Sequence, residues 1–180
     1  MPIFRKSVPQ EPLIIAMAGV RLGDRVLILA GDDAELTVAV GAKVGLSGRT
    51  LVLSATHDAA ERVTARAERR GVLVESAAGP DSLPHDADSF DLAIADARPR
   101  TSNPLLSESV AGRLRSLLRP GGRLIVLVAS PAGFRLPWQS QPRQPADTRD
   151  LEQRLLAAGF RAVRQVGTRD GTTFLEAKRS

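Results

Sequence analysis

The sequence contains no cysteine, and this absence removes several kinds of chemistry at once. Disulfide bonds, thiolate zinc sites and cysteine nucleophiles all require a residue type that the chain does not have. Aromatic residues are also scarce, at 3% of the chain with no tyrosine and a single tryptophan. Because sites that stack single-stranded bases depend on aromatic side chains, the composition argues against a site of that kind.

Long hydrophobic runs are also absent. The apolar stretches are much shorter than the roughly 20 residues that a transmembrane helix needs, so we expect no membrane span. The amino terminus has prolines at 2, 9 and 12 and no continuous apolar segment, which is not the pattern of a secretory signal peptide. A cytoplasmic protein is therefore expected. The length of 180 residues fits one domain, and 43% hydrophobic residues are enough for a buried core.

The formal net charge of +5 comes almost entirely from arginine. Basic residues are spread along the chain with acids between them, as on a solvated surface, so the pattern argues against a nucleic-acid partner. One stripe at helical spacing, formed by Arg62, Arg66, Arg69 and Arg70, is flanked by Glu61 and Glu68. We interpret it as a solvated helix face, with RNA binding as a weaker alternative.

Short apolar runs alternate along the chain with longer segments of helical periodicity. The expected strands cover 25–30, 50–54, 72–75, 90–95, 123–128, 161–168 and 172–178. The expected helices cover 34–44, 58–70, 104–118 and 148–158, with Asp58 and Glu61 as a capping box. Near-continuous apolar strands separated by helices predict a parallel sheet covered on both faces. The last two strands predict a hairpin around Arg169-Asp170-Gly171.

Four blocks of sequence resemble motifs of the class I S-adenosylmethionine-dependent methyltransferases, especially their small-molecule branch. They are Gly23–Leu29 (GDRVLIL), Asp88–Leu92 (DSFDL), Leu118–Leu124 (LRPGGRL) and Leu155–Phe160 (LLAAGF). The resemblance spans about 20–178. It implies an α/β, three-layer, doubly wound and mostly parallel seven-stranded sheet of Rossmann-like type, with a C-terminal antiparallel hairpin.

The resemblance also implies a methyltransferase-like domain over 20–180, preceded by an N-terminal extension and helix over 1–19. Within that extension, the apolar turn Leu13–Met17 is a candidate helix covering the cleft. The Pro-rich segment 130–147 contains Trp138 and follows the fifth strand. Its role stays open between a lid, an oligomer contact and a segment pinned to the core.

The motif that binds the cofactor in the family is altered here. The family's first strand ends in an acid and a G-x-G-x-G loop, which brings the backbone close to the methionine part of the cofactor. In this chain the acid position is Ile28, and the three glycine positions are Ala30, Asp32 and Ala34, with Gly31 between the first two. The family's cofactor loop is therefore degenerate in this sequence.

Two further anchors of the family also differ. The acid that takes the ribose hydroxyls corresponds to Ser54, and the Gly-Asp pair at the adenine corresponds to Ala78-Gly79, with Asp81 as a substitute only if the loop shifts. Asp32 and Asp33 place negative charge where the cofactor's carboxylate is held, although both suit capping of the following helix. The candidate cofactor-binding residues, for S-adenosylmethionine, are Ala30, Gly31, Asp32, Ser54, Gly79 and Asp81.

Two residues are candidates for the chemistry of transfer. Asp96 follows the fourth strand, where the family places residues that face the transferring methyl group, and His85 is a candidate general base. Capping of a loop is an equally adequate account of Asp96. The amine-methylating motif of the family is absent, because Asp96 is followed by Ala97, Arg98 and Pro99. No cluster of His and Asp has the spacing of a metal site, so we expect no bound metal.

Two functions from different classes fit these observations. The first is an S-adenosylmethionine-dependent methyltransferase of a small molecule, with an atypical cofactor loop. The second is a catalytically inactive pseudo-methyltransferase that keeps the fold and serves as a binding or assembly module. The expected partners are a small-molecule acceptor or a protein partner, including a second copy of the chain in a homodimer.

Overall fold

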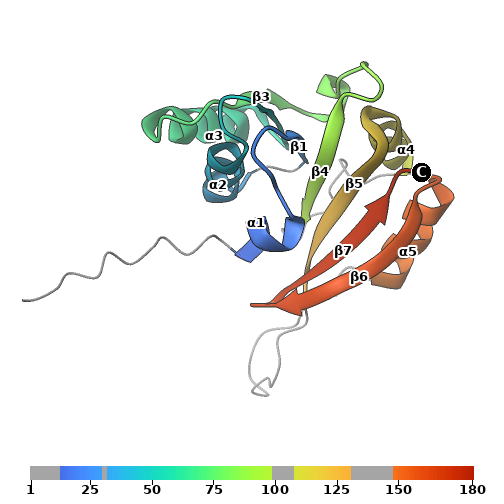
Figure 1. Ribbon diagram of the computed structural model, residues 1–180. Coiled ribbons are helices and arrows are strands. Elements are labelled where there is room, and N and C mark those ends of the chain that lie inside the picture. Colours follow the sequence, from blue (N-terminus) through green and yellow to red (C-terminus); the bar gives the residue numbers. More distant parts are fainter. Residues whose placement is uncertain (1–12, 30–31, 99–107, 131–147) are drawn as a thin grey trace, which may run out of the picture.

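The structure, a computed structural model, describes residues 13–29, 32–98, 108–130 and 148–180. In these segments seven strands form one sheet in the order β3-β2-β1-β4-β5-β7-β6 (Figure 1). The strands are β1 Arg25–Leu29, β2 Arg49–Ser54, β3 Glu75–Ala78, β4 Phe90–Ala97, β5 Leu118–Ala129, β6 Arg161–Arg169 and β7 Thr172–Lys178.

Helices cover both faces of this sheet. The helices are α1 Leu13–Ala18, α2 Ala34–Val44, α3 His57–Arg69, α4 Glu108–Leu117 and α5 Thr148–Ala157, with a 3₁₀ turn η1 at Pro80–Ser82. Buried residues of α1, α2 and α3 pack on one face, and those of α4 and α5 pack on the other. The expected three-layer architecture is confirmed.

The pairing of the strands also agrees with the expected topology. β1 pairs in parallel with both β2 and β4, so the direction in which strands are added to the sheet reverses between β1 and β4. β5 continues the parallel set beside β4. β7 is antiparallel to both β5 and β6, which confirms the C-terminal antiparallel hairpin.

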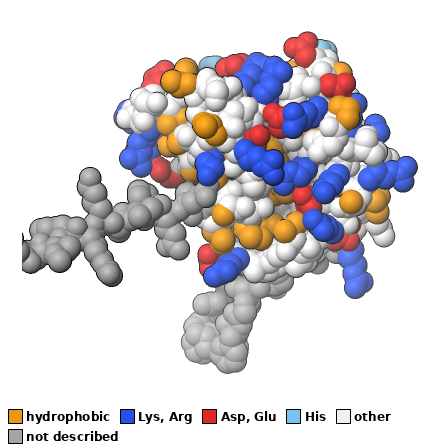
Figure 2. Space-filling view, viewed as in Figure 1, with side chains coloured by type: hydrophobic (Ala, Val, Ile, Leu, Met, Phe, Trp, Pro, Cys, Tyr) orange, Lys and Arg blue, Asp and Glu red, His pale blue; other side chains and the backbone are white. Residues whose placement is uncertain are grey.

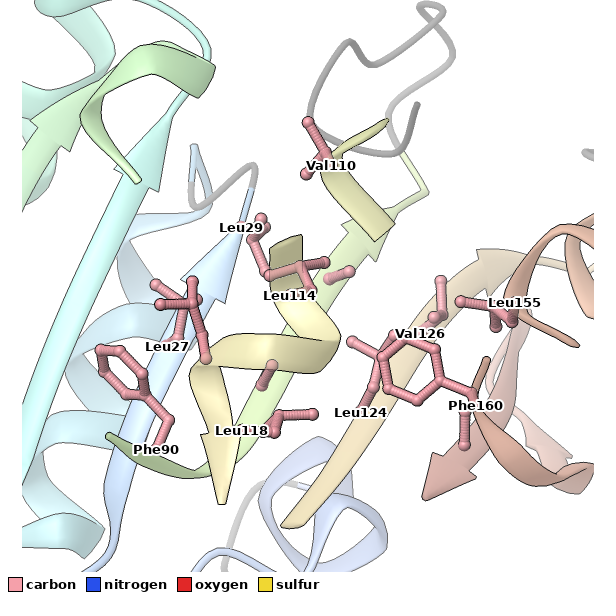
Figure 3. Close-up of a cluster of buried hydrophobic side chains, with 14 of the residues drawn as sticks. Leu27, Leu29, Phe90, Val110, Leu114, Leu118, Leu124, Val126, Leu155 and Phe160 are labelled. Carbon is pink, nitrogen blue, oxygen red and sulfur yellow. The ribbon is translucent and has the colours of Figure 1, made fainter. Parts of the chain in front are cut away.

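The core consists of two clusters, one on each face of the sheet. Along β1, Val26 and Ile28 belong to the cluster beneath α1–α3, whereas Leu27 and Leu29 belong to the cluster beneath α4 and α5. Figure 3 shows the second cluster, in which side chains of β1, β4 and β5 meet those of α4 and α5. A strand buried on both faces needs apolar residues at successive positions, which is why these strands are continuous apolar runs.

Two local predictions were wrong. The third strand begins at Glu75 and not at Val72, because the Val72 and Val74 side chains pack against Gly41 of α2 before the chain joins β2. The cap of α3 is Thr56, whose hydroxyl accepts a hydrogen bond from the Ala59 N–H at 3.2 Å. Asp58, the expected cap, lies in the first turn of the helix.

The N-terminal helix is part of the main core. In α1, Ile15 and Ala18 are fully buried in the same cluster as residues of α2 and β1. The Met17 Cε atom lies 3.1 Å from where a Cβ would stand on Gly167 of β6. The predicted helix over 104–118 is seen from Glu108 onward, and its first residues, like the 131–147 part of the Pro-rich segment, lie outside the described residues.

We predict opposite effects for two glycine-to-alanine substitutions in helices. In α2, a Cβ on Gly41 would stand 2.5 Å from a Val72 methyl carbon, so Gly41→Ala should destabilise the fold by about 1–3 kcal/mol despite alanine's higher helix propensity. In α4, a Cβ on Gly112 would meet nothing within 4 Å, so Gly112→Ala should stabilise it by up to about 1 kcal/mol. Urea unfolding measures both changes, and equal effects would contradict this account.

Candidate functional site

The candidate site lies at the carboxyl ends of β1, β2 and β4. In an open α/β sheet, ligands bind beyond these ends at the point where strand addition reverses, which here is between β1 and β4. Charged residues stand at the ends of two of these strands: Asp32 and Asp33 after β1, and Asp96 and Arg98 at the end of β4. Ser54 is the last residue of β2.

A bridge of ionic hydrogen bonds connects the end of β4 to the start of α2. The Arg98 Nε donates to Asp96 Oδ1 at 2.8 Å, and the Nη2 donates to Asp96 Oδ2 at 2.7 Å. The same Nη2 also donates to Asp33 Oδ2 at 3.2 Å. The Asp96 side chain is 2% exposed and the Arg98 side chain 25% exposed, so the bridge is largely shielded from water.

The bridge keeps Arg98 charged. Its hydrogen bond to Asp96 raises the pKa of the guanidinium, burial opposes this, and the negative charges of Asp96 and Asp33 raise it further. The net result is a pKa above the ordinary value of arginine. Both Asp96 oxygens accept from Arg98, so Asp96 holds Arg98 in place.

The start of α2 is capped by the protein itself. The Asp33 Oδ1 accepts hydrogen bonds from the Glu35 and Leu36 N–H groups, each at 3.1 Å. These first N–H groups of a helix have no partner within the helix and are where an anionic ligand would bind. Here the carboxylate of Asp33 occupies that place.

Asp32 connects the segment after β1 to the end of β2. Its Oδ1 accepts a hydrogen bond from the Ala55 N–H at 3.2 Å. Ser54, the residue before Ala55, is fully buried, and its carbonyl oxygen accepts from the Gly79 N–H at 3.0 Å. The structure therefore brings Asp32, Ser54 and Gly79 to one end of the sheet, as the sequence predicted, and places the Asp32 carboxylate beside the end of β2.

The chain after β3 turns sharply at Gly79. Gly79 has φ +79°, and a Cβ there would meet nothing within 4 Å, so glycine serves the backbone conformation and the space beside it is open. Asp81 follows in η1 and is exposed. Arg113 of α4 fixes this turn by donating to the Pro80 carbonyl oxygen at 3.3 Å and to that of Leu83 at 3.1 Å.

His85 lies apart from this group. It is exposed on the segment between η1 and β4, next to Asp86, whose charge acts on Arg49 at the start of β2. The start of a parallel strand lies at the opposite edge of the sheet from its carboxyl end, so this neighbourhood is not that of Asp96. Ala30 and Gly31 lie outside the described residues.

Two residues of the site were not found by sequence reasoning. Arg98 stands two positions after Asp96, but nothing in that spacing reveals which direction its side chain takes. Arg113 is a helix residue far along the chain from the turn that it fixes.

In the described segments no group of three or more His, Cys, Asp or Glu residues could hold a metal ion. No helix of these segments is long and apolar enough to cross a membrane.

Comparison with solved structures identifies the fold. A SAM-dependent methyltransferase from Aquifex aeolicus superposes with a TM-score of 0.75, covering 94% of this chain and 95% of that one, at 14% identity. A methyltransferase from Pyrococcus furiosus gives a TM-score of 0.62 at 16% identity, covering 89% of this chain and 77% of that one. The fold is that of the class I S-adenosylmethionine-dependent methyltransferases.

Curated sequences agree with this class. The chain is 32% identical over 116 residues to the ubiquinone/menaquinone biosynthesis C-methyltransferase UbiE of Azotobacter vinelandii, and 30% identical over 117 residues to that of a Marinomonas species. Each match covers 63% of this chain and 45% of the relative, so the chain spans less than half the length of these relatives. No family model matches the sequence. The protein is thus methyltransferase-like in both fold and sequence.

The fold alone does not determine a reaction. A structure described as the [4+2]-cyclase SpnF superposes with a TM-score of 0.67 at 17% identity, covering 93% of this chain and 78% of that one. A cyclase and methyltransferases therefore have the same architecture as this chain. The residues at the carboxyl edge, and not the sheet, must carry the functional argument.

We predict that the buried bridge contributes more to stability than an exposed ion pair of similar geometry. Arg98→Gln leaves the Asp96 carboxylate buried without its partner and should cost about 3 kcal/mol. Arg49→Gln removes a comparable two-bond pair with Glu75, whose side chain is 55% exposed, and should cost about 1 kcal/mol. Denaturant unfolding at neutral pH measures both, and a larger loss for Arg49→Gln would contradict the ranking.

Proposed function

We propose that this chain is an S-adenosylmethionine-dependent methyltransferase of a small molecule that binds its methyl donor through an altered set of contacts. The supporting observation is the hydrogen bond from the Ala55 N–H to Asp32 Oδ1, which places a carboxylate at the end of β2. In the family that the chain resembles, an acid at the end of the second strand takes the ribose hydroxyls, and here that strand ends in Ser54. Asp32 supplies this acid from the neighbouring segment.

The adenosine half of the donor fits the residues present. Among the described residues, the second carboxylate oxygen of Asp32 has no protein partner, so it is available to accept from ribose hydroxyls. The open space beside Gly79 adjoins Ser54, because Gly79 N–H donates to the Ser54 carbonyl. Asp81, exposed in η1, is the nearest acid in sequence for the adenine amino group. These contacts recognise a nucleoside.

The amino-acid half of the donor fits less well. The N–H groups at the start of α2 that would take its carboxylate are already bound by Asp33. Two carboxylates, of Asp33 and Asp96, hold the Arg98 guanidinium, and Asp32 adds a third negative charge beside the end of β2. This charge balance attracts a positively charged sulfonium and repels a carboxylate. The crevice therefore suits the adenosine and the sulfonium of the donor better than its carboxylate.

The residues of the chain act by binding and orientation. S-adenosylmethionine, when bound, supplies a methyl group on a positively charged sulfur. The carboxylates of the crevice stabilise that charge before transfer, and the ribose contact of Asp32 fixes the direction in which the methyl points. Asp96 is a positioning residue that holds Arg98 against Asp33. His85 has no role in this proposal because of its place on the η1–β4 segment.

The second candidate is a binding or assembly module without transfer activity. The capping of α2 by Asp33 favours this function, because the helix start is complete without a ligand. Ser54 at the ribose position supports it as well, since a buried neutral hydroxyl cannot replace a carboxylate. The partner of such a module would be another protein or a second copy of the chain.

Calorimetric titration with S-adenosylmethionine and with 5′-methylthioadenosine, which lacks the amino-acid carboxylate, tests the proposal. We expect S-adenosylmethionine to bind more tightly, because 5′-methylthioadenosine lacks the positive sulfonium that the crevice carboxylates attract. Asp32→Asn should weaken both ligands by about tenfold because the ribose contact loses its charge. Glu68→Gln is the matched control, since this exposed acid stands near the end of α3, far along the helix from the crevice. It should bind as the unaltered chain does.

The outcomes separate the two candidates. If neither ligand produces heat or a rise in Tm at millimolar concentration, the methyltransferase proposal is wrong and the binding module is the function that stands. If both bind but Asp32→Asn has no effect, the chain binds an adenosyl ligand and the ribose role given to Asp32 is wrong.

A further inference from the structure

A group of cations on β5, β6 and β7 lies away from the carboxyl-edge crevice. Figure 2 shows Lys and Arg side chains in a band over the part of the molecule that these strands form. Strand register identifies the residues that share this side of the sheet, which we call the basic face: Arg123, Arg161, Arg164 and Lys178. Arg161, Arg164 and Lys178 are exposed, and Arg123 is half-buried.

A bulge in β6 brings two of these cations to the same side. Arg161 is opposite Lys178 and Arg164 is opposite Glu176, so three steps along β6 match two steps along β7. In a regular strand, residues three apart point to opposite faces of the sheet. The extra residue, accompanied by φ +49° at Ala162, therefore turns Arg161 and Arg164 to one face.

A buried carboxylate holds the basic face in place. The Arg164 Nε and Nη2 donate to Glu176 Oε2 at 3.0 and 2.8 Å, and Arg123 Nη1 lies 3.5 Å from Glu176 Oε1. Burial raises the pKa of the Glu176 carboxyl, but the hydrogen bond from Arg164 and the surrounding positive charges outweigh burial and lower it overall. Glu176 is therefore ionised at neutral pH and keeps both guanidinium groups fixed.

One carboxylate does not neutralise four cations. Arg161 and Lys178 form no ion pair among the described residues. The arginine stripe on α3 differs, because its Arg66 is paired with Glu35. The excess positive charge of the sheet is thus concentrated on the basic face. It could not be found from the sequence, because the register of β5, β6 and β7 brings these residues together.

The chemistry of the basic face suits one kind of partner. Large exposed hydrophobic residues, on which protein interfaces depend, are nearly absent from β5–β7, with Val166 at 43% exposure the exception among the described residues. Addition of a peptide strand at the β6 edge is disfavoured by two irregularities in its register. Exposed aromatic rings for stacking bases are also absent there, since Phe160 and Phe174 are buried. What the face offers is fixed positive charge.

We propose that the basic face binds the phosphate backbone of double-stranded nucleic acid without reading its sequence. Guanidinium groups held in place by a buried acid are ready to pair with phosphate oxygens. Spacing also fits, since paired cations on neighbouring strands stand about 5 Å apart. Arg161 and Arg164 are opposite β7 residues that are two positions, or about 7 Å, apart, so several phosphates are met at once. This inference is independent of the function proposed for the crevice.

Fluorescence anisotropy with a short labelled RNA duplex, at a series of salt concentrations, tests the proposal on the full chain. Four phosphate contacts should give a slope of log K against log salt of about −3.6, so affinity falls by about 100-fold between 50 and 200 mM salt. A DNA duplex and an RNA duplex of unrelated sequence should bind with similar salt slopes. Arg161→Gln with Lys178→Gln should make the slope shallower by about 2 and weaken binding at 50 mM salt.

A second pair of substitutions controls for net charge. Arg62→Gln with Arg69→Gln removes the same charge from exposed positions on α3 and should leave affinity and slope within about twofold and 0.5 of the unaltered chain. Unchanged Tm values establish that each variant is folded. The proposal would be overturned if the two pairs of substitutions lowered the affinity equally, or if the slope of log K against log salt for the unaltered chain were near zero. Displacement of the duplex by an equal charge concentration of poly-L-glutamate would also overturn it, in favour of an acidic protein partner.

Discussion

Burial of the central strands on both faces is the constraint on which the rest of the structure depends. β1 carries apolar side chains at four successive positions, Val26–Leu29, and the clusters on its two sides join it to α1–α3 and to α4–α5. Parallel strands need long crossovers, so each strand is followed by a segment that leaves from the same edge of the sheet. The crevice between β1 and β4 is a consequence of this arrangement, and any ligand site is built from whatever follows those strands.

Charge at such an edge has to be balanced locally. Asp96 is buried near the end of β4, and its carboxylate is tolerated because Arg98 folds back onto it. Arg98 then reaches Asp33, which also caps α2. One interaction thus links the fourth strand, the second helix and the electrostatic character of the crevice, so a substitution at any of these positions affects all three.

The sequence was sufficient to predict the architecture, but not the exact residues at which a strand begins or a helix is capped. Periodicity located the strands and helices of the sheet, and the motif around Arg119-Pro120-Gly121-Gly122 led to the right fold. Val72–Val74 was mistaken for a strand because β-branched residues suit both a strand and packing against a helix. The contact of Val72 and Val74 with Gly41 of α2, which shows that they pack against a helix, is visible only in the structure. The cap at Thr56 was missed because Asp58 and Glu61, two residues later, form the more typical capping-box pattern.

Side-chain direction explains what could not be foreseen at the sites. Asp32 and Asp33 were found as candidates, yet their partners, Ala55 and Arg98, are set by the meeting of distant segments. The basic face depends on register, which composition does not encode. The bulge at Ala162 adds one residue to β6 between Arg161 and Arg164. That added residue, whatever its type, moves the Arg161 side chain from one side of the sheet to the other. A relative that lacked only this one added residue in β6 would therefore keep every arginine and yet have a different electrostatic surface.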